Sequence, residues 1–393
     1  MTSLPLDGLL VVACEQAVAA PLATRHLADL GARVIKIERP KVGDFARAYD
    51  RTVKGMSSHF VWLNRSKESL TVDLKDDRGR DIVARLIAQA DVFVQNFAPG
   101  AAERLGLGGP ELTARHPGLV HCSISGYGSS GPYRDAKAYD LLIQAETGVL
   151  SITGTPEQPS KTGIPVADIA AGMYAFSGIL AALVERGRTG RGRVVEISLF
   201  DALTEWMGYP MYWTSYGGTP PARFGAEHPG IAPYGPFATA DSEIVVAIQN
   251  DREWRTFADQ VLGRPELGTD PRFATNTDRV ANRAAVHAAV DAVLVLLPFD
   301  EVARRLTAAR IANGRMNDVD GLLNHPQLAE RGRWQTVESP VGELAALLPP
   351  ITLPGTTPRM DPVPDLGEHT ADILTVLGYD ADGIAALRRE GIV

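Results

Sequence analysis

The feature that most restricts the possible folds is an alternation of strand-like and helix-like segments in the first half of the chain. Residues 9–13, 33–37 and 92–94 are short apolar runs that predict buried strands, whereas residues 19–30 and 78–90 show helical patterns between them. Strands that alternate with helices form a mostly parallel sheet covered on both faces. The sequence therefore predicts an α/β fold with a large Rossmann-like domain.

The second half of the chain no longer shows this regular alternation of strands and helices. A length of 393 residues gives room for about two domains. We expect the N-terminal part of the large domain at 1–205, a linker rich in Pro, Gly and aromatic residues at 206–236, and a smaller α+β domain at 237–325. A second Pro-rich linker at 326–365 and a helical return to the large domain at 366–393 complete this prediction.

Composition excludes several classes of protein. The net charge is -8 and no basic stripe is present, so we expect no nucleic-acid partner. Cys14 and Cys122 lie in apolar runs and are expected to be free thiols in the cytoplasm. The N-terminus lacks the charged start of a signal peptide, and the apolar run 169–184 is too short to cross a membrane. Zinc-hydrolase and α/β-hydrolase motifs are missing from the sequence, and we expect no metal.

A glycine motif at residues 126–131 offers one alternative function. It matches the G-x-G-x-x-G pattern of nicotinamide-binding proteins and follows a predicted strand. However, Pro132 and the residues after it predict a loop instead of the helix on which a pyrophosphate would rest. We therefore expect no NAD, and an NAD-dependent oxidoreductase stays an alternative.

Asp168 stands where a loop turns into a helix that carries no charged residue between 169 and 184. This composition predicts a helix that is buried all round and ends near Gly187 and Gly190. The positive end of the helix dipole favours an ionised carboxylate, which is the nucleophilic form. Asp is also a common N-cap residue, so a purely structural capping role is the alternative.

Polar and cationic residues recur after several of the predicted strands. Residues 38–40 follow one strand, residues 96–100 with Arg104 follow another, and residues 137–140 follow a third. Ligands of open α/β sheets bind at the carboxyl ends of the strands, and cations there suit a phosphorylated ligand.

Taken together, these segments resemble family III CoA-transferases, the group that includes formyl-CoA transferases and the related α-methylacyl-CoA racemases. The resemblance covers nearly the whole chain. It rests on residues 30–40 with 43–44, 64–67 with 73–75, 96–100 with Arg104, 126–128 with Pro132, 167–168 with 172–173, and 189–192.

The resemblance implies that Asp168 is the nucleophile of an acyl-CoA:carboxylate CoA-transferase that forms an aspartyl-CoA thioester. Family members are interlocked homodimers, in which two long linkers join a large and a small domain. The coenzyme A site that the resemblance implies comprises Val18, Arg39, Val72, Asp73, Leu74, Lys75, Asn96, Phe97, Ala98, Arg104, Lys137, Ala138, Tyr139 and Asp140.

Departures from the family pattern narrow the expected reaction. Tyr139 occupies the place of the racemases' histidine, and a phenol is a poorer base than an imidazole at neutral pH, so transfer is favoured over racemisation. Val18 replaces a glutamine of formyl-CoA transferases and their glycine run is missing, which argues against formate and oxalate. We expect succinyl-CoA as donor and a dicarboxylate such as succinate, malate, citramalate or itaconate as acceptor. A racemase and a non-catalytic CoA-binding protein stay open. The side chains expected near the acceptor are Arg223, His228, Gln249 and Asn250.

Overall fold

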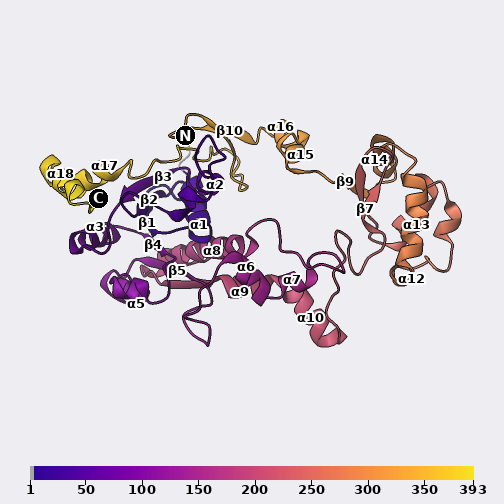
Figure 1. The fold of residues 1–393 in the computed structure, drawn as a ribbon, viewed down its shortest axis with the longest axis horizontal. Helices are drawn as coiled ribbons and strands as arrows, with labels where there is room; N and C mark the ends of the chain where they lie inside the picture. Colours follow the sequence, from indigo (N-terminus) through magenta and orange to yellow (C-terminus); the bar gives the residue numbers. More distant parts are fainter. Residues whose placement is uncertain (1–3) are drawn as a thin grey trace. The chain divides into compact units, whose positions relative to one another are not determined.

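The computed structural model describes residues 4–393, which form two compact units. Unit 1 consists of residues 4–147, 163–208 and 328–393, and unit 2 of residues 148–162 and 209–327. Three separate stretches of chain thus build unit 1 (Figure 1).

Unit 1 is organised around a six-stranded sheet in the order β3-β2-β1-β4-β5-β6. Every pairing in this sheet is parallel, which confirms the α/β fold expected from the alternating segments. The order changes direction between β1 and β4, where ligands of such sheets bind. The strands are β1 (Leu10–Cys14), β2 (Arg33–Glu38), β3 (Lys67–Thr71), β4 (Val92–Gln95), β5 (Val120–Ser125) and β6 (Val194–Ser198).

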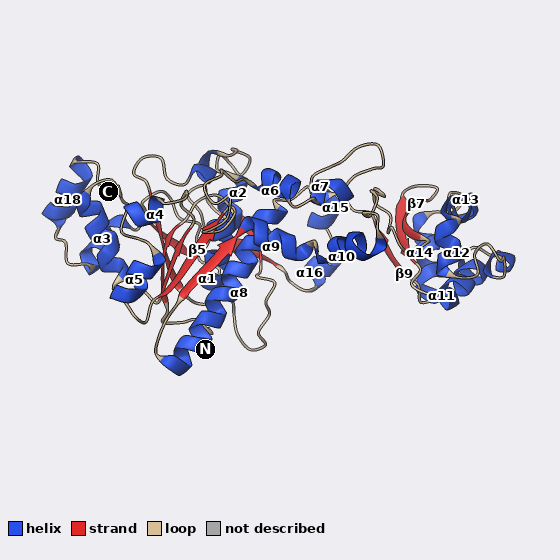
Figure 2. Ribbon diagram, turned by 90° about the horizontal axis from the view of Figure 1, so that it is seen from below, coloured by secondary structure: helices blue, strands red, loops and turns tan. Residues whose placement is uncertain are grey.

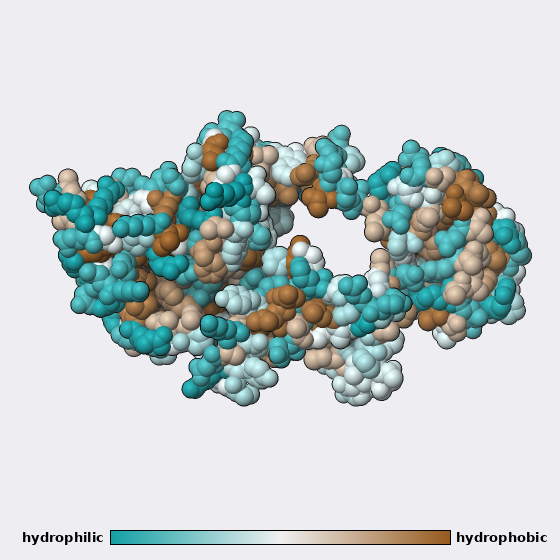
Figure 3. Space-filling view, viewed as in Figure 1, coloured by the Kyte–Doolittle hydropathy of each residue, from teal (hydrophilic) through white to brown (hydrophobic). Residues whose placement is uncertain are grey.

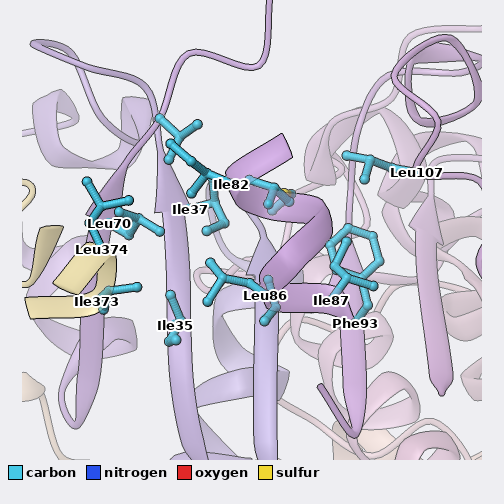
Figure 4. Packing of buried hydrophobic residues seen from close by; sticks show 14 of the residues in the cluster. Ile35, Ile37, Leu70, Ile82, Leu86, Ile87, Phe93, Leu107, Ile373 and Leu374 are labelled. Atoms are coloured by element: carbon cyan, nitrogen blue, oxygen red, sulfur yellow. The ribbon is translucent and has the colours of Figure 1, made fainter. Parts of the chain in front are cut away.

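Helices cover both faces of this sheet (Figure 2). On one face, α3 (Asp77–Ile87), α5 (Gly109–Arg115), α17 (Thr370–Val376) and α18 (Ala381–Arg389) share one apolar cluster with the strands. Figure 4 shows this packing, with Ile82, Leu86 and Ile87 of α3 facing Ile35 and Phe93. The other face is covered by α1 (Ala19–Asp29) and α8 (Val166–Thr189). The remaining elements are the 3-10 turn Phe45–Ala48, α2 (Ser58–Asn64), α4 (Ala101–Arg104), α6 (Asp140–Glu146), α9 (Leu199–Trp206) and the hairpin β10 (Trp334–Val337)–β11 (Leu344–Leu347).

Unit 2 is an antiparallel sheet packed against helices. Its core contains Trp254, Phe257 and Phe273. Asn282 separates two helices, Asn276–Ala281 and Arg283–Leu294, and part of the Pro-rich linker predicted at 206–236 is helical. The elements are α7 (Val149–Ile152), α10 (Gly208–Gly217), β7 (Tyr234–Ala238), β8 (Glu243–Ala247), α11 (Asp251–Thr256), the π-helical turn Phe257–Val261, the 3-10 turn Pro265–Gly268, α12 (Asn276–Ala281), α13 (Arg283–Leu294), α14 (Phe299–Ala308), β9 (Ala312–Arg315) and α15 (Val319–Leu323), with α16 (Pro326–Glu330) at the junction of the units.

The structure corrects two expectations about α8. The helix is buried on one face and not all round, because α1 and the sheet pack along one side, while Met173 and Val184 are exposed. It is also longer than the apolar run suggested, and by length and composition its 24 residues could cross a membrane. Its buried face nevertheless packs against α1, α9 and β6 as a core helix does.

Gly172 lets α8 approach α1 closely. A Cβ atom added at Gly172 would lie 2.7 Å from the carbonyl oxygen of Ala19 and 3.1 Å from Leu22. Only glycine therefore fits this contact without a shift of one helix. The close approach holds the first turn of α8, and with it Asp168, beside the beginning of α1.

We predict that Gly172→Ala lowers the free energy of unfolding by about 1–3 kcal/mol through overpacking. Alanine is otherwise favoured over glycine inside helices by about 1 kcal/mol, so Gly187→Ala, at an exposed site of α8 with open space around it, is the matched control. Urea unfolding of both variants tests this expectation. An equal change in the free energy of unfolding of the two variants, in the same direction, would contradict it.

Candidate active site

A cavity of about 320 Å³ lies at the carboxyl ends of β1, β2 and β3. We call it the edge cavity. It brings together seven of the residues that the family resemblance assigns to coenzyme A: Arg39, Val72, Asp73, Leu74, Lys75, Phe97 and Arg104. The other lining residues are Cys14, Glu15, Gln16, Ile37, Glu38, Gly43, Asp44, Ala101 and Leu105. The buried carboxylates in this lining, Glu15, Glu38 and Asp44, are each paired with a cation. The remaining apolar side chains and the exposed cations suit a ligand that joins an apolar part to phosphates.

The guanidinium of Arg104 lies against the glycine before its helix. Gly100 has a φ of 70°, and a Cβ atom there would lie 2.9 Å from Nη1 of Arg104. Glycine therefore serves both the left-handed backbone and the space that the guanidinium occupies. Within residues 96–104, Gly100 and Arg104 are therefore linked by backbone conformation and packing.

The turn at residues 15–18 connects the edge cavity with the first turn of α8. Asn96 brackets Gln16: the Gln16 N–H donates to Oδ1 of Asn96 at 2.9 Å, and Nδ2 of Asn96 donates to the Gln16 carbonyl at 2.8 Å. Ala17 has a φ of 64°, and its N–H donates to Asp44 at 3.1 Å. Val18 is buried and packs with Leu22 and Leu63, and Ile169, next to Asp168, packs against this cluster. Asn96 and Val18 thus support the wall of the cavity without lining it.

A fully buried ion cluster lies under this turn. Nζ of Lys67 contacts Glu15 at 2.7 Å, and Nζ of Lys36 contacts Asp44 at 2.8 Å and Glu15 at 3.4 Å. Thr24 of α1 donates a further hydrogen bond to Glu15 at 2.6 Å. Burial alone would raise the pKa of Glu15, but Lys67 and Lys36 hold it below its ordinary value. Burial lowers the pKa of Lys67 to about 8, although Glu15 opposes this shift, so both members of the Glu15–Lys67 pair are largely charged at neutral pH.

Asp168 is the third residue of α8 and is half-buried. Pro165 occupies the N-cap position and provides no side-chain hydrogen bond, whereas Asp168 lies inside the first turn, so Asp168 is not the N-cap residue that the alternative required. The carboxylate of Asp140 contacts this first turn, because the Ala167 N–H donates to its Oδ1 at 2.8 Å, while its Oδ2 accepts from Gln144 at 2.6 Å.

The charge state of Asp168 differs from the expectation. Burial, and then the negative charge of Asp140, raise the pKa of Asp168 to about 7. The helix dipole was expected to favour the ionised form, but desolvation outweighs it here. A carboxylate with such a pKa is more basic than an ordinary one and still substantially ionised at neutral pH, which suits a nucleophile.

Tyr49 is within electrostatic range of both Asp44 and Asp168. Burial raises its pKa to about 12, and Asp44, Asp168 and Tyr139 contribute to this shift. Asp44 lines the cavity, so the phenol interacts electrostatically with one residue of the cavity wall and with the candidate nucleophile. Its ring packs edge-on against His59 with centroids 5.3 Å apart.

The other residues assigned to coenzyme A lie elsewhere in unit 1. Ala98 lines a neighbouring hollow of about 310 Å³ near the ends of β4 and β5. Ala138 packs on Gly126, Lys137 is exposed, and Tyr139 is 65% exposed at the start of α6. None of these described residues lines the edge cavity; Asp140 instead contacts the first turn of α8 beside Asp168.

The unit 2 side chains expected near an acceptor make contacts within that unit. Arg223 donates to the carbonyl oxygens of Thr155 and Pro156, both at 2.8 Å. Asn250 caps α11, and the ring of His228 stacks on Tyr234. The backbone N–H of Gln249 donates to Glu253, which belongs to α11.

The glycine motif at residues 126–131 forms a loop and no helix start. The Gly128 N–H donates to Ser125 Oγ at 3.0 Å, and the next helix begins only at Asp140. A Cβ atom at Gly126 would lie 2.2 Å from Cβ of Ala138, so packing accounts for that glycine. Within residues 4–393 no group of three or more His, Cys, Asp or Glu side chains is arranged to hold a metal ion.

Sequence reasoning missed several residues of this site: Glu15, Gln16, Asp44 and Tyr49. Asp44 lay within a quoted motif, and its position shortly after a predicted strand end was the available signal. Glu15 offered the similar signal of a charge directly after the first apolar run.

Comparison with known proteins gives the class to which this site belongs. The family model for CoA-transferase family III matches residues 6–370. The chain is 39% identical to an acetyl-CoA:oxalate CoA-transferase of Acetobacter aceti over 83% of this chain and 84% of that protein. It is 34% identical to a succinate–glutarate CoA-transferase of Agrobacterium fabrum, with 95% and 96% covered. A crystal structure of a CAIB/BAIF family protein from Brucella suis superposes with a TM-score of 0.85 at 36% identity, covering 96% of this chain and all of that one.

The chain therefore belongs to CoA-transferase family III, as the resemblance in its sequence indicated. It is a CoA-transferase of this family, and CoA thioesters are the substrates of such enzymes.

The electrostatics of Asp168 predict the pH dependence of transfer. Since the ionised carboxylate is the nucleophilic form and its pKa is raised to about 7, the rate should increase as the pH rises through about 7. Asp140→Asn removes a negative charge but keeps an acceptor for the Ala167 N–H, so the pKa of Asp168 should fall and the increase should move to lower pH.

The measurement is kcat as a function of pH for the wild type, Asp140→Asn and Asp140→Ala. The alanine variant loses both the charge and the hydrogen bond, and should lose activity at every pH in addition. Profiles that rise at the same pH in wild type and Asp140→Asn would show that Asp140 does not influence the nucleophile.

Proposed function

We propose that the protein transfers CoA from succinyl-CoA to a dicarboxylic acid through a thioester on Asp168. The observation that carries the proposal is the first turn of α8, which bears the half-buried Asp168 and packs through Ile169 on Val18 of the 15–18 turn, while Glu15 and Gln16 of the same turn line a cavity with exposed cations. Relatives support the donor and acceptor classes: a protein of Chloroflexus aurantiacus named succinyl-CoA–D-citramalate CoA-transferase is 33% identical, with 99% of this chain covered.

The proposed reaction has two symmetrical halves. Asp168 attacks the thioester carbonyl and expels the CoA thiolate. The donor acyl group and the Asp168 carboxylate are then joined as a mixed anhydride. The thiolate then attacks the aspartyl carbonyl, so that the donor leaves as a carboxylate and CoA stays on Asp168. The acceptor carboxylate repeats these steps in reverse order, and Asp168 is regenerated as new acyl-CoA leaves.

In this proposal the edge cavity holds the coenzyme. Arg39, Lys75 and Arg104 bind its phosphates, and Val72, Leu74 and Phe97 contact its apolar and ring portions. Binding energy from these remote contacts positions the thioester carbonyl at Asp168. Tyr49, whose raised pKa keeps its proton, is placed to donate a hydrogen bond near the reacting carbonyl.

We further propose a cytoplasmic homodimer of the interlocked kind, with linkers at 206–236 and 326–365. Exposed aromatic residues on α10 support a covered surface, since Tyr212 is 70% and Tyr216 85% exposed. Apolar side chains also reach the surface of both units, shown in brown in Figure 3. Light scattering that gives the monomer mass of 42.1 kDa would reject the dimer.

Substitution of Asp168 tests the proposed nucleophile. Asp168→Asn keeps the shape but removes the nucleophilic oxygen, so CoA transfer should fall by at least about a thousandfold, and Asp168→Ala should behave alike. Free CoA should still bind within about threefold of the wild-type Kd, because the cavity contacts are untouched. Transfer by both variants at near wild-type rates would refute the role.

A screen of acids identifies the substrates in the same assay. Succinyl-CoA is offered with glutarate, malate, citramalate and itaconate, and acetyl-CoA with oxalate, the pair in the name of the relative from Acetobacter aceti. Mass spectrometry reads the acyl-CoA products. Exchange of an α-hydrogen with deuterated water without transfer would favour the racemase alternative.

A further inference from the structure

The last part of the chain packs along β3, an edge strand of the sheet of unit 1. The Ser69 N–H donates to Nδ1 of His369 at 3.2 Å, and the Thr71 N–H donates to Oγ1 of Thr370 at 3.1 Å. These bonds satisfy strand groups that would otherwise lie open at the sheet edge. The C-terminal segment therefore covers this edge of the sheet, although it is distant in sequence.

One contact of this segment reaches the wall of the edge cavity. The Asp73 N–H donates to the carbonyl oxygen of Ile392 at 2.7 Å. On its other side the Asp73 carbonyl abuts Gly79, where an added Cβ atom would lie 2.1 Å away. Nη1 of Arg80 holds the next two carbonyls, of Leu74 at 3.0 Å and Lys75 at 2.9 Å. The wall is thus held between the beginning of α3 and the C-terminal segment.

Apolar packing fixes the segment that supplies this carbonyl. Ile392 is 3% exposed and belongs to the same buried cluster as Leu70 and Val72. Figure 4 shows Ile373 and Leu374 beside Leu70 in this cluster. Val72 belongs both to the cluster and to the cavity lining, so displacement of the segment acts directly on the cavity.

We propose that Ile392 is a positioning residue for coenzyme A, because its backbone carbonyl fixes the Asp73 peptide and thereby the cavity wall at residues 72–75. This inference rests on the proposed function, which assigns the edge cavity to CoA. Asp168 lies on α8, on the other face of the sheet, so loss of the Ile392 contact weakens CoA binding and leaves the chemical step intact.

The test compares three variants with the wild type. A chain ending at Gly391 lacks the carbonyl, and Ile384→Ala removes a side chain from the same buried cluster but no contact of Asp73. The third variant, Gly391→Val, keeps the full chain but places a β-branched residue at a φ of 74°, which displaces Ile392. It serves where the shortened chain does not fold.

Calorimetry with free CoA and steady-state kinetics give the readouts. Loss of one short hydrogen bond and of the order it imposes should raise the Kd for CoA and the KM for acyl-CoA about tenfold, with kcat and the acceptor KM within about twofold of wild type. Ile384→Ala should lower the midpoint of thermal unfolding while the Kd for CoA is retained.

Two results would overturn the inference. The first is wild-type affinity for CoA in the folded shortened chain or in Gly391→Val. The second is a loss of affinity in Ile384→Ala as large as the loss in those variants. The proposed function fails separately, when the wild type itself binds no CoA, and this inference then falls with it. A wild type that binds CoA and transfers it, beside variants of unchanged affinity, rejects only the role of Ile392.

Discussion

The buried ion cluster of Glu15, Lys36, Lys67 and Asp44 is the interaction on which the site depends. Charges are costly to bury, and a buried pair is stable only when every partner is present. Removal of one partner would leave an uncompensated charge between the sheet and α1. The relative positions of the four side chains are therefore tightly constrained. The cluster holds Glu15 at the beginning of the 15–18 turn and Asp44 opposite Ala17, whose left-handed backbone it stabilises. The 15–18 turn, held in place by the ion cluster, thus connects the cavity wall to the first turn of α8.

The second constraint is the close contact of α8 with α1 at Gly172. It fixes where the helix begins relative to the 15–18 turn, and Asp140 fixes the first turn from the other side. The same arrangement sets the chemistry, because burial and the charge of Asp140 raise the pKa of Asp168 to about 7. In the proposed reaction Asp168 alternately attacks a thioester and leaves from an anhydride, and a basicity near neutrality suits both roles.

Much of this fold could be predicted from local pattern, and much of the site could not. Short apolar runs placed β1, β2 and β4 to within a few residues, and the residues after β2 and β4 led to Arg39, Phe97 and Arg104 in the cavity. The one-sided burial of α8 was hidden, because its composition is apolar on both faces. The pKa of Asp168 depends on Asp140 from another helix, and no spacing in the sequence reveals that contact.

The most direct test of the account is to look for CoA on Asp168. The enzyme is mixed with succinyl-CoA without acceptor, quenched in acid and digested, and the peptide that contains Asp168 is examined by mass spectrometry. We predict a peptide in which CoA is joined to Asp168 as a thioester, with release of the donor acid as a free carboxylate. Turnover of acyl-CoA in the full reaction with no adduct on this peptide, or with CoA on another side chain, would contradict the account.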